Sequence, residues 1–89
     1  MKQFIEGLKV ECIDGQFQDT KTNPFLVSDL NLPKERENYI VREVIDTSHG
    51  TGILLAEIHN NRYYFDDVKE LREPIFSVNR FEIVERQVN

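Results

Sequence analysis

The fold is decided by the stretch Tyr39-Ile-Val-Arg-Glu-Val-Ile45, by the Asp46-Thr-Ser-His-Gly-Thr-Gly52 segment after it, and by Ile53-Leu-Leu-Ala-Glu-Ile58. The first and last runs are rich in β-branched and other apolar residues, whereas the middle segment is polar and contains two glycines. Two strand-like runs joined by a short loop with glycine are the strongest hairpin indication that a single sequence gives. The sequence therefore predicts a small β domain organised around this hairpin.

The first strand of the hairpin changes the face on which its apolar residues fall. Tyr39 and Val41 share one face, whereas Val44 falls on the other. Such a shift indicates either that both faces are covered or that a bulge or sharp bend lies near Arg42 and Glu43. A strand bent in this way can take part in two sheets of a small barrel.

Three more segments are predicted to be strands, namely residues 7–13, 62–65 and 80–84. Residues 7–13 alternate between apolar and polar side chains and end at Asp14-Gly15, which is typical of a turn. Residues 80–84 alternate in the same way and close the domain. The side chains expected to face the core from the first and last of these strands are Leu8, Val10, Cys12, Phe81 and Ile83.

The connecting segments carry their own signals. Residues 16–37 contain prolines that interrupt regular structure, but they also carry enough apolar side chains to pack on the fold as a long first loop, with one helical turn around residues 25–30. A short helix is expected near Asp67–Arg72, because Asp67 and Glu70 have the spacing of a capping box. A tight 3₁₀ turn is expected at residues 76–79.

Together these elements describe one all-β domain. Five short strands, a long first loop and a tight turn before the last strand are typical of a five-stranded SH3-like barrel. A chain of 89 residues is long enough for a single domain, which we expect to span residues 1–89 with its core between about 7 and 84.

Composition and charge narrow the range of functions. The net charge of −5 argues against a surface that tracks phosphates, because nucleic-acid binding relies on Lys and Arg. A single cysteine excludes a disulfide within the monomer and fits a reducing compartment. The N-terminus lacks the long apolar core of a signal peptide, and no run is long enough to span a bilayer, so we expect a cytoplasmic protein without a membrane partner.

Four stretches in order resemble one protein family: Gly7-x-Lys-Val-x-Cys-Ile-Asp-x-x-Phe17, Tyr39-Ile-Val-Arg42, Gly52-Ile-Leu-Leu-Ala-Glu57-Ile-x-Asn60 and Glu73-Pro-x-Phe76-x-x-x-Arg80-Phe81. They are similar to a family of small uncharacterised proteins from phages, prophages and their bacterial hosts, which have an SH3-like barrel. The resemblance covers residues 7 to about 84, and it implies a fold and an association with mobile elements but no established activity. The sequence departs from the family at Lys34–Asn38, where the family has a turn with glycine, and at residues 63–72, where the family has a variable loop.

Nothing in the sequence indicates catalysis or metal binding, so we predict a protein that is not an enzyme and has no cofactor and no metal site. Cys12 falls on the inward face of a strand with no histidine nearby in sequence, and it is expected to pack in the core. His49 and His59 lie at opposite ends of the strand 53–58, too far apart to share a metal. Five carboxylates around one loop are expected to form a solvated acidic face: Glu57, Asp66, Asp67, Glu70 and Glu73.

Four polar residues of the family pattern have two interpretations, namely Glu57, Asn60, Glu73 and Arg80. They could form a shared binding site. Alternatively, Glu57 or Glu73 could pair with Arg42 or Arg80 while Asn60 shapes a turn. We favour the structural interpretation, since polar residues at turns and strand edges commonly bond to backbone groups.

Arg62-Tyr63-Tyr64-Phe65 is the best candidate for recognition of a partner. Alternation places either Tyr64 inward with Tyr63 and Phe65 outward, or the reverse, and an outward ring next to Arg62 is typical of a binding hot spot. The competing interpretation is that these rings cover one end of the barrel. We predict a non-enzymatic module that binds an unknown protein or peptide through Phe25, Arg62, Tyr63 and Tyr64, as an accessory protein of a phage or other mobile element.

The alternative is a nucleic-acid-binding SH3-like domain. It would use Lys34, Arg36, Arg42 and Arg62, with the aromatic rings as stacking platforms. The negative net charge counts against this function. An exposed edge strand would allow two copies to pair, so we expect a monomer or a weak dimer.

Overall fold

The computed structural model describes residues 3–21 and 23–84. Within these residues the chain has strands and short 3₁₀ helices but no α-helix, which confirms the all-β class. The elements are β1 (Lys9–Cys12), η1 (Val27–Asp29), β2 (Asn38–Thr47), β3 (Gly50–Leu55), β4 (Tyr63–Phe65), β5 (Glu70–Arg72), β6 (Phe76–Ser77), η2 (Val78–Arg80) and β7 (Phe81–Ile83).

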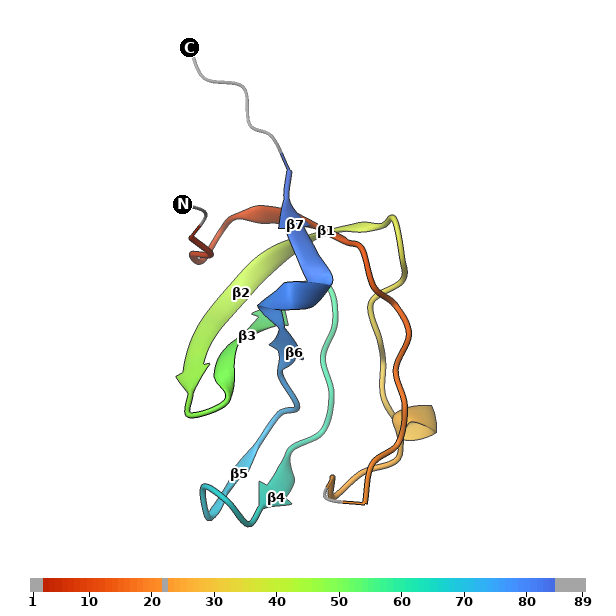
Figure 1. The fold of residues 1–89 in the computed structure, drawn as a ribbon, viewed down its shortest axis with the longest axis vertical. Coiled ribbons are helices and arrows are strands. Elements are labelled where there is room, and N and C mark those ends of the chain that lie inside the picture. Colours follow the sequence, from red (N-terminus) through yellow and green to blue (C-terminus); the bar gives the residue numbers. More distant parts are fainter. Residues whose placement is uncertain (1–2, 22, 85–89) are drawn as a thin grey trace.

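The larger sheet has five antiparallel strands in the order β6-β3-β2-β1-β7, and β4 and β5 form a separate two-stranded ribbon. In Figure 1 this ribbon lies at the lower end of the molecule, and β1 and β7 lie near the top. Within the described residues β6 pairs only with β3 and β7 only with β1, so the sheet is open and the closure expected of a barrel is not formed. The 3₁₀ turn predicted at residues 76–79 begins two residues later, as η2, because Phe76 and Ser77 pair with β3, and η2 connects these two edge strands.

The β2–β3 hairpin confirms the central prediction, although β3 ends at Leu55 and not at Ile58. Its loop is only Ser48-His49, shorter than the predicted segment 46–52, because the ladder continues to the Thr47–Gly50 pair. The register shifts between Val41 and Glu43, so of the two explanations that the sequence left open, the bulge near Arg42 and Glu43 is the one observed. The beginning of β2 pairs with β1, and the remainder pairs with β3.

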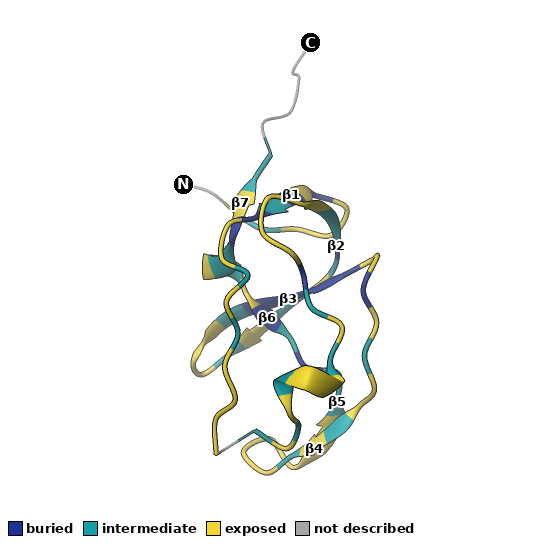
Figure 2. Cartoon of the chain, turned by 90° about the vertical axis from the view of Figure 1, so that its right-hand side faces the viewer, coloured by how far each residue is buried: buried dark blue, intermediate teal, exposed yellow. Residues whose placement is uncertain are grey.

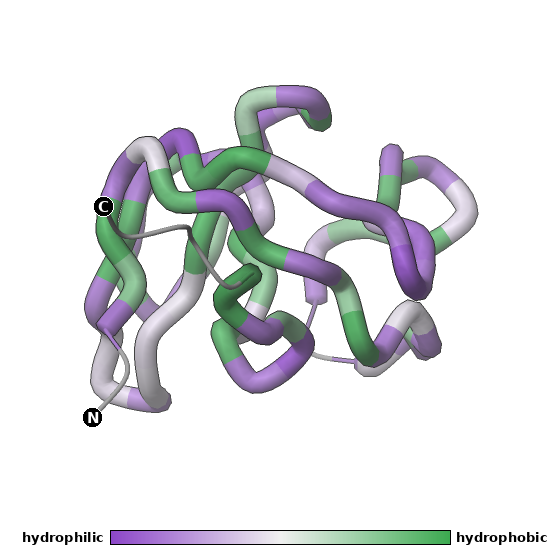
Figure 3. The backbone as a smooth tube through the Cα atoms, turned by 90° about the horizontal axis from the view of Figure 1, so that it is seen from above, coloured by the Kyte–Doolittle hydropathy of each residue, from purple (hydrophilic) through white to green (hydrophobic). Residues whose placement is uncertain are grey.

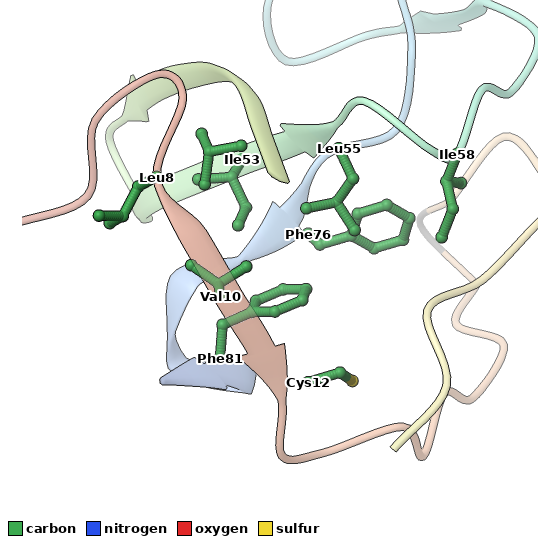
Figure 4. Close-up of a cluster of buried hydrophobic side chains, with 9 residues drawn as sticks. Leu8, Val10, Cys12, Ile53, Leu55, Ile58, Phe76 and Phe81 are labelled. Atoms are coloured by element: carbon green, nitrogen blue, oxygen red, sulfur yellow. The ribbon is translucent and has the colours of Figure 1, made fainter. Parts of the chain in front are cut away.

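The core is formed by side chains that the strands of the larger sheet direct toward one another, as Figure 4 shows. The alternation predicted for residues 7–13 is confirmed, because Val10 and Cys12 are fully buried. In Figure 2 the buried colour gathers on the larger sheet, whereas the β4–β5 ribbon is intermediate or exposed. The buried cluster consists of Leu8, Val10, Cys12, Val41, Ile53, Leu55, Ile58, Phe76 and Phe81.

The long connection between β1 and β2 packs against this core, as predicted. Phe17 and Leu32 are partly buried against it, and Pro33 is buried. η1 is the predicted helical turn in the middle of this connection. A turn at its end returns the chain to β1, where the Arg36 N–H donates to the Cys12 carbonyl over 2.7 Å. The connection is therefore a packed wall of the domain.

The predicted helix near Asp67–Arg72 is wrong. Residues 66–69 form a turn, and Glu70–Arg72 is β5, which pairs with β4. Lys69 has a φ of 55°, which interrupts a right-handed helical turn, and its N–H donates to the Phe65 carbonyl over 2.7 Å. The capping-box spacing is outweighed because so short a segment is not stable as a helix, whereas strand pairing satisfies its backbone groups.

Hydrophobic residues are spread along the described chain in short runs. Figure 3 shows that these runs alternate with hydrophilic ones over most of the tube. Within residues 3–21 and 23–84 there is no helix with the length and apolar character needed to cross a membrane.

Candidate functional site

A groove of about 700 Å³ lies between the long first connection, the tip of the β2–β3 hairpin, the β4–β5 ribbon and the segment before β6. Hollows of roughly 300–1,000 Å³ are typical of ligand sites. The apolar part of its lining includes Phe17, Phe25, Leu30, Phe65, Ile75 and Phe76. Among the described residues its charged side chains are Asp46, Asp67, Arg72 and Arg80, and we refer to this hollow as the groove.

Aromatic contacts join the long connection to the sheet and to the ribbon. Phe17 meets Phe76 edge to face, with ring centroids 5.9 Å apart. Phe25 lies 6.1 Å from Phe65 and 5.4 Å from Tyr63, centroid to centroid. Rings at these separations attract one another beyond the effect of the area that they bury. Phe17 thus fixes the long connection to the larger sheet, and Phe25 fixes it to the ribbon. Both rings line the groove.

The structure separates the four residues predicted for binding. Phe25 lines the groove, and Tyr63 packs against Phe25 from the ribbon. Tyr64 is 50% exposed while Tyr63 and Phe65 are half-buried, so Tyr64 is the outward residue of the strand. Arg62 is exposed and makes no hydrogen bond or ion pair within the described part of the chain. Only Phe25 and Tyr63 are therefore brought together.

A polar network holds together the segment before β4 and the segment after β5, which connect the ribbon to the larger sheet. Arg42, beside the bulge in β2, donates from Nη2 to Glu73 Oε2 over 3.0 Å and to the Ile58 carbonyl over 3.1 Å. The same Glu73 oxygen accepts the Asn60 N–H over 2.9 Å. Hydrogen bonds with a charged partner are stronger than neutral ones. One ion pair thus fixes both the entry and the exit of the ribbon that forms a wall of the groove.

Asn60 extends this network to the long connection. The Asn31 N–H donates to Asn60 Oδ1 over 2.7 Å, and Asn60 Nδ2 donates to the Asn31 carbonyl over 3.0 Å. Nearby, Glu57 Oε1 accepts the Ile40 N–H over 3.0 Å. The predicted pairing of Glu73 with Arg42 is therefore confirmed, whereas Glu57 bonds to the backbone of Ile40 and not to an arginine. Asn60 joins two distant segments and is not limited to shaping a local turn.

Arg80 ties η2 to the start of the long connection. Its Nη1 donates to the Gln16 carbonyl over 2.8 Å and lies 3.3 Å from Asp14 Oδ1. Its guanidinium carbon lies 4.0 Å from the centroid of the Phe17 ring, which is a cation–π contact. The structural role expected of Arg80 is confirmed, although its partners are Asp14 and Phe17 and not Glu57 or Glu73.

The four basic residues of the nucleic-acid hypothesis are not gathered on one surface. Arg42 is held in the network with Glu73. Lys34 and Arg36 belong to the segment that leads into β2, the start of which pairs with β1, whereas Arg62 directly precedes β4. In Figure 1, β1 and β4 lie at opposite ends of the molecule. A stripe that follows a phosphate backbone therefore does not form from these four side chains.

The remaining candidates for chemistry have structural roles or exposed positions. Cys12 is fully buried, and burial raises the pKa of its thiol. Asp66, Asp67 and Glu70 are exposed, as predicted, but Glu73 is not, because it belongs to the network with Arg42. Within residues 3–21 and 23–84 no group of three or more His, Cys, Asp and Glu side chains could hold a metal ion.

The groove also contains residues that the sequence does not single out, such as Leu30, Asp46 and Ile75. They come from segments far apart in the chain, and no local pattern marks them as neighbours. For Leu30, the sequence offers only one indication: it belongs to a long connection with more apolar side chains than an exposed loop would carry.

No protein-family model, no curated protein and no solved structure matches this chain. The family resemblance seen in the sequence therefore stays a prediction.

Proposed function

We propose that this chain is a non-enzymatic SH3-like module that binds an extended segment of another protein in the groove. The single observation that carries the proposal is a hollow of about 700 Å³, lined by aromatic side chains, where four separate segments meet. Following the family resemblance, we propose an accessory protein of a phage or other mobile element. We place it in the cytoplasm because its single cysteine fits a reducing compartment.

The arrangement of the strands supports the SH3-like part of the proposal. A long connection precedes β2, β2 contains a bulge and pairs with both β1 and β3, and a 3₁₀ turn joins the last two strands. Such scaffolds carry many different functions, which depend on the loops that they hold in place. Here the loops and turns of the chain form the groove.

The composition of the groove supports a protein segment as its occupant. Four phenylalanines line it, and aromatic residues and arginine are enriched where proteins bind each other. The ring contacts of Phe17 and Phe25 and the network around Glu73 hold the walls in position. A site whose walls are already in place loses less conformational freedom on binding.

The test is a display selection of random octapeptides against the immobilised protein and two matched variants. Val27 lines the groove, whereas its neighbour Leu26 lies outside it and is 56% exposed. We expect Val27→Lys to abolish capture of the selected peptides and Leu26→Lys to leave their affinity within about twofold. Circular dichroism spectra and melting curves check that both variants fold.

Selection of no peptide, or equal capture by the two variants, would refute the groove as a protein-binding site. The nucleic-acid alternative is tested by titrating the same proteins with a fluorescent single-stranded DNA oligonucleotide. Tight binding that falls steeply with salt would favour that alternative.

A further inference from the structure

The two arginines of the groove already have counter-charges. Arg72 Nη2 lies 2.9 Å from Glu70 Oε2, and Arg80 Nη1 lies 3.3 Å from Asp14 Oδ1. Neither Glu70 nor Asp14 belongs to the lining of the groove. Both guanidinium groups are therefore paired with carboxylates from outside the lining, and they offer little net positive charge to an occupant.

The two aspartates of the groove have no such compensation. Asp46 Oδ1 accepts the Thr51 hydroxyl over 2.8 Å, and Asp67 Oδ1 accepts the Val68 N–H over 3.0 Å. Both donors are neutral, and within residues 3–21 and 23–84 neither carboxylate has a cationic partner. The groove thus combines an apolar surface with two carboxylates that lack a counter-charge.

We infer that the occupant is a peptide segment that combines apolar side chains with Lys or Arg, an inference that rests on the proposed function. The apolar side chains cover Phe25 and Phe65, and the basic side chains bond to Asp46 and Asp67. A cation that reaches either carboxylate forms a charge-assisted hydrogen bond, whereas an acidic segment meets uncompensated like charge. The net charge of −5 acts in the same direction at longer range.

The test uses two fluorescein-labelled peptide pools with the same degenerate apolar centre, one flanked by lysines and the other by glutamates. Fluorescence anisotropy measures the affinity of each pool for the whole chain. We expect the lysine pool to bind at least about fivefold more tightly than the glutamate pool. In the double variant Asp46→Asn with Asp67→Asn, this preference should fall to about twofold or less, because asparagine keeps the Oδ1 acceptor but removes the charge.

A matched double variant separates the groove from the overall charge. Glu43→Gln with Asp66→Asn also removes two carboxylates from β2 and from the turn of the ribbon, but at exposed positions outside the groove. We expect this variant to keep the lysine preference. An equal loss of preference in both double variants would overturn the inference.

The outcomes also separate this inference from the proposed function. A glutamate pool that binds the wild-type chain as tightly as the lysine pool, and is released by Val27→Lys, would overturn the inference and leave the proposed function standing. Failure of both pools to bind the wild-type chain would overturn the inference and the proposed function together.

Discussion

Replacing Glu73 with alanine is expected to destabilise the domain, because one carboxylate oxygen holds two groups in place. Glu73 Oε2 accepts from Arg42 Nη2 over 3.0 Å and from the Asn60 N–H over 2.9 Å. The side chains of Glu73 and Arg42 are only 13% and 28% exposed. Truncation leaves the guanidinium of Arg42 without its counter-charge and the Asn60 N–H without its acceptor.

The magnitude follows from the burial of the pair. Removing one partner of a fully buried ion pair costs about 3–5 kcal/mol, and breaking an exposed pair costs about 0–1 kcal/mol. The Arg42–Glu73 pair lies nearer to the first case, but Arg42 keeps its bonds to the Leu55 and Ile58 carbonyls. We expect the free energy of unfolding to fall by about 2–3 kcal/mol, which corresponds to roughly 10–20 °C in Tm for a domain of this size.

Urea denaturation followed by far-UV circular dichroism measures this loss, since the chain has no tryptophan to report on unfolding. The control is Glu70→Ala, which breaks an ion pair whose glutamate is 56% exposed and should cost less than about 1 kcal/mol. Arg42→Met combined with Glu73→Leu should cost less than the sum of the two single substitutions, because it leaves no unpaired charge. Equal effects of Glu73→Ala and Glu70→Ala would refute the reasoning.

Three further predictions concern packing. Gly52→Ala should lower the unfolding free energy in urea titrations by about 1–3 kcal/mol, because a Cβ there would overlap Ile75 Cδ1 and lie 3.0 Å from Ile75 Cβ. Ile75→Val, which removes Cδ1, should recover part of the loss. Tyr63→Ala should lower Tm by removing a ring packed on Phe25, whereas Tyr64→Ala should change the unfolding free energy by less than about 0.5 kcal/mol. A thiol reagent should label Cys12 at least about 100-fold more slowly in the native protein than in urea, because the thiol is buried and its pKa is raised; similar rates would mean that Cys12 is accessible.

Features encoded by neighbouring residues could be predicted from the sequence. The hairpin was predictable because strand propensity and turn composition act over a few residues. The parity change between Val41 and Val44 narrowed the explanation to a bulge or to coverage of both faces. The burial of Cys12 follows in the same way from the alternation of its strand. The helix expected near Asp67–Arg72 is wrong because the strand Tyr63–Phe65 offers this segment a pairing partner that its own residues do not reveal.

The sequence by itself therefore determined an all-β domain, its central hairpin and the inward face of its first strand, since these depend on periodicity along one segment. Only the tertiary structure decided which charges are paired and which are free. Arg42 and Glu73 are 31 positions apart, and Asn31 and Asn60 are 29 apart. Asp46 and Asp67 likewise line the same groove, although they belong to different hairpins. Contacts between distant segments are set by how the strands pair and pack, and composition alone does not reveal them.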